Sequence, residues 1–154
     1  MVHLSAYLSP DHIHLALPGE NKAQLLREIA TRMATKSNAL SADKIVDLLT
    51  AREKLASTGV GHSIAIPHAS SNEIDTACVS LFRTAEPVAF DAVDDEPVRL
   101  LMVVLAPQSN QALHLKLLAT IARLVRSATV RETLLTIDSG HEVLDYIASL
   151  EGTS

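Results

Sequence analysis

The chain predicts a three-layer α/β domain in which helices cover both faces of a mixed sheet. One nearly continuous apolar and β-rich run, residues 98–105 (V-R-L-L-M-V-V-L), is typical of a central strand that is buried on both sides. Two amphipathic helical patterns precede this run and three helical segments follow it. The order is strand, two helices, several strands and three helices, which does not repeat a regular βαβ unit. With 154 residues and no internal repeat, we expect a single domain over residues 1–154.

The first predicted element is an edge strand at residues 12–17, closed by Pro18 and Gly19. Its alternation places His12 and His14 on one face, where they could be interpreted as a metal-binding pair. No third ligand stands nearby at metal-binding spacing, so a solvated strand face is the favoured interpretation. The sequence therefore predicts no metal site.

Two helices are predicted next. The apolar periodicity predicts a helix over residues 21–35, and residues 38–40 form a turn. Ser41 is the expected N-cap of a second helix that continues to about Lys54. Arg52 lies in the last turn of that helix, so its guanidinium can reach over the loop that follows.

The second half of the chain alternates predicted strands, turns and helices. The expected elements are a loop at 70–75, a strand at 76–83, a break at Glu86-Pro87, an extended segment at 88–93, a turn at 94–97, the central strand at 98–105, a loop at 106–110 and a helix at 111–126. Two short helices close the chain, with capping boxes that begin at Thr129 and Ser139.

Composition excludes several classes of function. The net charge of −5 and the absence of Trp give no support for nucleic-acid binding. No apolar run approaches the roughly 20 residues that span a bilayer, and the N-terminus does not resemble a signal peptide. Cys78, the single cysteine, rules out an internal disulfide and is interpreted as a small core residue. We therefore expect a cytoplasmic protein without direct membrane insertion.

Residues 52–70 (R-E-K-L-A-S-T-G-V-G-H-S-I-A-I-P-H-A-S) gather most of the groups that carry chemistry. Residues 64–66 predict a brief buried strand that Pro67 stops, which places His68 at a fixed strand end. Gly59 and Gly61 permit positive φ or a close backbone approach. Hydroxyls at positions 57 and 58 could donate to an anion. A histidine held against anion donors is suited to phosphoryl chemistry.

The same stretch resembles a known family. The pattern S-T-G-V-G-x-x-I-A-I-P-H, preceded by R-E-K, is similar to the active-site signature of the IIA proteins of the bacterial phosphoenolpyruvate-dependent phosphotransferase system, in the fructose–mannitol class and its nitrogen-regulatory relatives. The resemblance continues in P-V-A-F-D-A-V-D-D-E-P-V and in the H-L-x-x-L-A-x-I-A-R-L run from His114. One position departs from it, because the family usually has glycine where this chain has Ser63.

The resemblance implies a mixed sheet of about five strands flanked by helices, and it implies roles for particular residues. It makes His68 the phosphoacceptor, His114 a supporting active-site histidine and Arg52 an active-site arginine, with Ser57 and Thr58 in the phosphate pocket. Each role has a structural alternative: a surface histidine, a helix boundary residue and a cation at the end of a helix, respectively. For His62, a solvated loop side chain is favoured over a third active-site histidine.

The function that follows is that of a phosphoryl carrier without a cofactor. No nucleotide-binding glycine loop is present, so the phosphate should come from another protein, which the resemblance identifies as HPr or its nitrogen-type paralogue. A free-standing IIA chain favours the nitrogen-regulatory type, which acts on target proteins. The alternative is a transport subunit that passes phosphate to a IIB domain. A remote alternative is a serine hydrolase, since G-H-S-I-A is close to a nucleophile elbow but lacks its last glycine.

Overall fold

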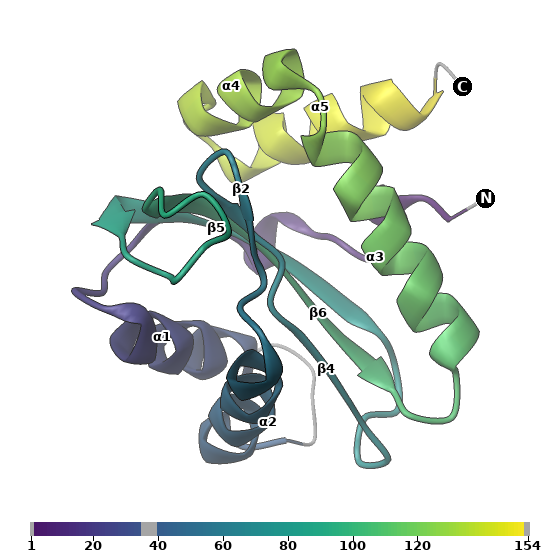
Figure 1. Ribbon diagram of the computed structural model, residues 1–154. Coiled ribbons are helices and arrows are strands. Elements are labelled where there is room, and N and C mark those ends of the chain that lie inside the picture. Colours follow the sequence, from purple (N-terminus) through teal and green to yellow (C-terminus); the bar gives the residue numbers. More distant parts are fainter. Residues whose placement is uncertain (1, 35–39, 153–154) are drawn as a thin grey trace.

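A single mixed sheet of six strands forms the centre of the computed structural model, which describes residues 2–34 and 40–152 (Figure 1). The strands are β1 (Ile13–Leu17), β2 (Gly59–Gly61), β3 (Ile64–Ala65), β4 (His68–Ser71), β5 (Cys78–Val88) and β6 (Val98–Pro107). The order across the sheet is β1-β5-β6-β3-β2, and β4 also pairs with β6. Pairing is antiparallel in β5–β6 and β2–β3 and parallel in β1–β5, β3–β6 and β4–β6.

Helices cover both faces of this sheet (Figure 1). One layer consists of α1 (Lys22–Ala34) and α2 (Ala42–Leu55), and the other contains α3 (Gln111–Val125), α4 (Ala128–Thr136) and α5 (Gly140–Gly152). Two 3₁₀ helices, Leu4–Ala6 and Pro10–His12, precede β1. The predicted three-layer architecture with a mixed sheet is confirmed, with six strands in place of about five. No helix in the described residues is long and apolar enough to cross a bilayer.

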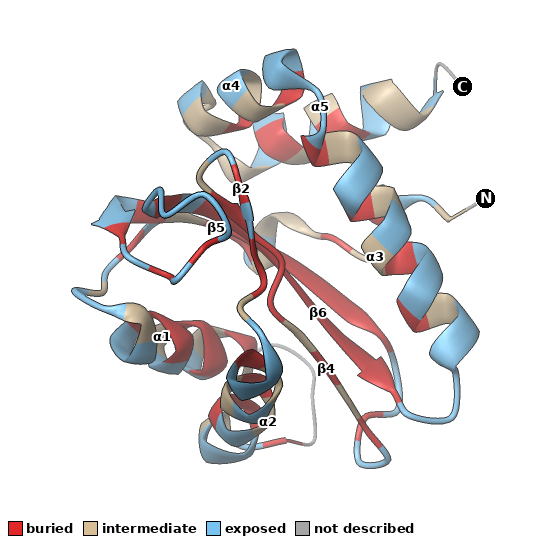
Figure 2. Ribbon diagram, viewed as in Figure 1, coloured by how far each residue is buried: buried red, intermediate tan, exposed pale blue. Residues whose placement is uncertain are grey.

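Strand β6 joins the two cores of the domain. Its side chains alternate between them: Leu101, Val103 and Leu105 pack in the core beneath α1 and α2. Leu100 and Met102 pack in the core beneath α3, α4 and α5. All five are fully buried, and Figure 2 shows the buried strands between the two helical layers. This two-sided burial is why the run reads as continuously apolar in the sequence.

The region around His68 differs from the predicted strand followed by a loop. Strand β3 ends at Ala65, and His68 begins the new strand β4, which includes two residues of the expected loop at 70–75. Pro67 separates β3 from β4 and cannot donate to β6, but its carbonyl accepts a hydrogen bond of 3.0 Å from the Val104 amide of β6. Both short strands therefore pair with β6, and this strand holds the backbone before and after His68.

The expected break at Glu86-Pro87 is wrong, because β5 continues to Val88. Its pairing with β6 shifts register between Arg83 and Val88, and this irregularity accommodates a proline that cannot donate to the ladder. The following turn also lies earlier than the predicted 94–97, since the Asp95 amide donates to the Ala92 carbonyl at 3.0 Å.

The predicted helix starts are confirmed at Ser41 and Ser139, whose hydroxyls accept from backbone amides at 3.2 and 3.1 Å. The predicted cap at Thr129 is wrong, because Ser127 caps α4 by accepting from the Val130 amide at 3.3 Å. The earlier serine offers the same oxygen and lets the helix begin at residue 128. Thr35 and the positions at 38–39 lie outside the described residues.

The expected solvated face of His12 and His14 is also wrong. His12 ends a 3₁₀ helix before β1 begins, and the ring of His14 stacks on Phe82 with centroids 5.2 Å apart. Within the described residues, no group of three or more candidate ligands could hold a metal ion.

Candidate active site

The structure brings three of the predicted site residues together. Arg52 comes from the last turn of α2, His68 from the first residue of β4 and His114 from the first turn of α3. All three line one open concavity of about 380 Å³. The remaining lining residues are Leu48, Ala51, Leu55, Ala69 and Ser70. Side chains from three elements far apart in the sequence thus converge at the edge of the central strand.

The hydrogen bonds of His68 define its tautomer. Its Nδ1 lies 2.8 Å from the carbonyl oxygen of Ile66, which can only accept, so Nδ1 carries the proton. Its Nε2 accepts a hydrogen bond of 3.2 Å from Nε of Arg52. The nitrogen that keeps its lone pair is therefore Nε2.

The surroundings of His68 favour its neutral form. Burial lowers the pKa of His68 below 6.5, the bond to the Ile66 carbonyl opposes this, and the positive charge of Arg52 adds a further, smaller lowering. A ring that is neutral near pH 7 with a defined unprotonated nitrogen is a nucleophile.

Arg52 contacts both the end of its own helix and His68. One terminal nitrogen of its guanidinium donates to the carbonyl of Ala56 at 3.0 Å, just beyond the end of α2, while Nε faces His68. The planar group is thus held at both ends across the start of the loop. A fixed guanidinium beside a nucleophilic nitrogen can stabilise the negative charge of an incoming phosphoryl group.

His114 lies across the concavity from His68. The ring centroids are 5.5 Å apart and the planes are inclined at 75°. Burial lowers the pKa of His114, and the neighbouring His68 adds to the lowering. Its Nε2 is buried and has no hydrogen-bond partner among the described residues. A buried nitrogen without a partner is costly, so an incoming polar group that paired with it would be stabilised.

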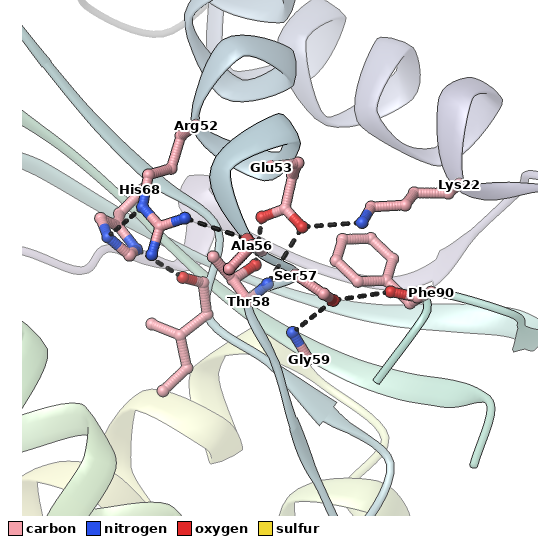
Figure 3. Close-up of polar contacts among 10 residues, drawn as sticks. Lys22, Arg52, Glu53, Ala56, Ser57, Thr58, Gly59, His68 and Phe90 are labelled. Atoms are coloured by element: carbon pink, nitrogen blue, oxygen red, sulfur yellow. Dashed lines mark hydrogen bonds and ion pairs between the residues drawn. The ribbon is translucent and has the colours of Figure 1, made fainter. Parts of the chain in front are cut away.

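The structure does not bring the hydroxyls of Ser57 and Thr58 to this concavity. Oγ of Ser57 donates to the carbonyl of Phe90 at 2.8 Å and accepts from the Gly59 amide at 3.1 Å (Figure 3). Thr58 is buried, and its hydroxyl donates to Glu53. Both side chains hold the loop between α2 and β2, and their place in a phosphate pocket stays a prediction.

Glu53 is a buried residue of the site region to which the sequence analysis assigned no role. Its side chain is only 5% exposed, forms an ion pair of 2.9 Å with Lys22 and accepts from the Thr58 amide at 3.0 Å. The signal was its spacing, because Ile45, Leu49 and Glu53 stand four residues apart on the buried face of one helix.

The two glycines of the motif, Gly59 and Gly61, have structural roles within the chain. A Cβ at Gly59 would lie 2.7 Å from Cβ of Ala92, so only glycine permits this close packing. Gly61 adopts a φ of +99°, and it is followed by a two-residue turn in which His62 and Ser63 have φ of 56° and 65°. This left-handed backbone explains why glycine suits the position of Ser63. His62 is exposed, as expected for a loop side chain.

A larger groove of about 990 Å³ lies elsewhere, along α1 and α2. Lys22 and Glu53 contribute to its lining, together with Pro18, Leu26 and Asp91. None of the residues that line it is a histidine or a cysteine, and none of the predicted site residues lies among them.

Comparisons with known proteins identify the family of the chain. A family model described as "Phosphoenolpyruvate-dependent sugar phosphotransferase system, EIIA 2" matches residues 6–150. A "Nitrogen regulatory protein" of Pseudomonas aeruginosa is 34% identical over 151 residues, 98% of this chain and 98% of that protein. A "PTS system fructose-specific EIIA component" of Haloferax volcanii is 39% identical over 108 residues, 70% of each chain. The crystal structure of the nitrogen regulatory protein IIA-Ntr from Neisseria meningitidis has a TM-score of 0.89 and 34% identity, covering 94% of this chain and 98% of that one.

Proposed function

Because the chain belongs to the EIIA 2 family of the phosphoenolpyruvate-dependent sugar phosphotransferase system, we propose that it carries the phosphoryl group on Nε2 of His68. The observation that carries this proposal is the tautomer of His68. The Ile66 carbonyl holds the proton on Nδ1, which leaves Nε2 as the nucleophile beside Arg52. The predicted family is confirmed by the family match over residues 6–150.

The transfer exchanges one nitrogen–phosphorus bond for another. The lone pair of Nε2 forms a bond to phosphorus as the bond to the donor's histidine breaks, and that histidine recovers its own lone pair. The proton on Nδ1 of His68 stays in place, held by the Ile66 carbonyl. The hydrogen bond from Nε of Arg52 to Nε2 breaks as phosphorus approaches, and the guanidinium, still held at the Ala56 carbonyl, donates to the phosphoryl oxygens. Nε2 of His114 can donate to the same oxygens when it carries a proton.

The donor that this site favours is a protein. The concavity is open, and Leu55 on its rim is 81% exposed, which provides apolar contact area beside the nucleophile. Together with the absence of a nucleotide-binding loop in the sequence, this supports HPr or its nitrogen-type paralogue as the donor.

The regulatory type is the favoured role. The relative from Pseudomonas aeruginosa that covers 98% of the chain is named a nitrogen regulatory protein, which supports a role in binding target proteins. The relative from Haloferax volcanii supports the second candidate, a transport subunit that passes phosphate to a IIB domain. Transfer from the labelled protein to fructose- and mannitol-type IIB domains discriminates the two. Rapid and complete transfer, coupled to sugar phosphorylation, would reject the regulatory type.

The test of the phosphoacceptor is labelling from phosphoenolpyruvate in the presence of enzyme I and HPr or its paralogue. The parent should acquire one phosphoryl group in an acid-labile, alkali-stable bond, and a His68→Ala variant should acquire none. A His62→Ala variant is the matched control, because His62 is exposed and lies in the turn before β3. Undiminished labelling of the His68→Ala protein would refute the assignment.

A further inference from the structure

We propose that Glu53 is a positioning residue, which fixes the tautomer of His68 through a continuous chain of hydrogen bonds. This inference rests on the proposed function only in taking His68 as the phosphoacceptor. It concerns a side chain that does not line the concavity, so its hydrogen bonds reach the reacting ring only through other residues.

The chain begins at the carboxylate of Glu53. One oxygen accepts from Nζ of Lys22 at 2.9 Å and from the Thr58 amide at 3.0 Å, and the other accepts from the Thr58 hydroxyl (Figure 3). A buried carboxylate is costly unless such partners satisfy it, so the carboxylate and Thr58 hold each other in place. Because both donors of Thr58 are used, the position and orientation of its peptide group are fixed.

The chain continues from Thr58 to the imidazole. The carbonyl of Thr58 accepts from the Ile66 amide at 3.0 Å, which fixes the residue before Pro67. The carbonyl of Ile66 in turn accepts from Nδ1 of His68 at 2.8 Å. Displacement of Thr58 would therefore move the acceptor that keeps the proton on Nδ1 and the lone pair on Nε2.

The same turn of α2 also reaches the other ring nitrogen. Arg52 directly precedes Glu53, and its Nε donates to Nε2 of His68 at 3.2 Å. One turn of helix thus controls both nitrogens, Nε2 directly through Arg52 and Nδ1 indirectly through Glu53. The ion pair with Lys22 ties that turn to the start of α1.

The test is a Glu53→Met variant, in which a side chain of similar length loses every carboxylate contact. Proton–nitrogen NMR spectra of the imidazole groups report which nitrogen of His68 carries the proton. We expect the population of the Nε2–H tautomer of His68 to increase. The rate constant of phosphoryl transfer should fall about 10–100-fold, the loss typical when an outer hydrogen-bond partner that orients a functional histidine is removed. The half-saturating concentration of HPr should stay unchanged, because the rim residue Leu55 is untouched.

Two further variants keep the test decisive. Thr58→Val preserves the shape of the side chain and the backbone amide but removes the hydroxyl. It should shift the tautomer of His68 in the same direction by a smaller amount. If Glu53→Met does not fold, this variant tests the role of Glu53 in its place. Leu134→Ala is the control for general destabilisation, since Leu134 is fully buried in the other core.

An unchanged Nδ1–H tautomer in the folded variants, or an equal shift in Leu134→Ala, would overturn the role of Glu53. The spectra are recorded on the unphosphorylated protein, so this failure is distinct from a failure of His68 as phosphoacceptor, which the labelling of His68→Ala tests.

Discussion

The two histidines of the concavity are held in different ways. On the β4 side, both ring nitrogens of His68 have partners, the Ile66 carbonyl and Arg52. On the α3 side, Nε2 of His114 is buried and without a hydrogen-bond partner among the described residues. The ring of His68 is thus already positioned by hydrogen bonds before a partner binds. His114, in contrast, keeps a buried nitrogen that is available to pair with an incoming group. We infer that His68 reacts and that Nε2 of His114 pairs with the charged oxygens of the transferred phosphoryl group.

The largest expected effect of removing a group from either side is on the rate of transfer. Arg52→Ala and His114→Ala should each slow phosphorylation of His68 by on the order of 10²–10³, if each acts like a single preorganised donor to a developing anion. Single-turnover kinetics with phosphorylated HPr measure the rate, and melting temperatures control for folding. Unchanged transfer in both variants would mean that other residues stabilise the transferred group.

The second expected effect is a loss of stability in acid. The pKa of His68 is lowered first by burial, and so is the pKa of His114, so the unfolded chain binds these protons more tightly than the folded one. Their contribution to stability is present above about pH 6.5 and is lost as the pH falls through the lowered folded values.

Melting temperatures from neutral pH to about pH 5 measure this effect, with a His68→Gln/His114→Gln variant as the reference. The parent should lose more stability than this variant over the interval. Equal losses would show that neither ring is held neutral by the fold.

The smallest expected effect separates the two rings by stability alone. His68→Leu removes two hydrogen bonds and should destabilise the protein by about 1–3 kcal/mol. His114→Leu removes a nitrogen that has no partner among the described residues, so it should leave the free energy of unfolding unchanged or raise it by up to about 1 kcal/mol. Urea denaturation of both variants measures the difference, and an equal loss in the two would contradict the comparison.

The sequence was sufficient for the residues whose roles follow from local patterns. The continuous apolar run of β6, the cap at Ser41 and the helix that carries His114 are governed by local periodicity, and all three are confirmed. The convergence of Arg52, His68 and His114 was accessible only through the family resemblance, since no local pattern states which distant elements meet.

Other features depend on tertiary contacts that no local pattern encodes. Strand β4 forms because β6 offers a free edge beyond β3, which overrides the polar residues Ser70 and Ser71. Pro87 stays within β5 because a register shift accommodates it. The family resemblance placed Ser57 and Thr58 in the phosphate pocket, yet their hydroxyls contact Phe90 and Glu53.

The position of the phosphoryl group on the imidazole of His68 tests the central claim most directly. Proton–nitrogen NMR spectra of the protein, before and after phosphorylation by phosphoenolpyruvate, enzyme I and HPr, identify the ring nitrogen that is modified. The hydrogen bond from Nδ1 to Ile66 predicts phosphorylation at Nε2 of His68, with the proton retained on Nδ1. A phosphoryl group on Nδ1 of His68, or on the ring of His114, would contradict the account.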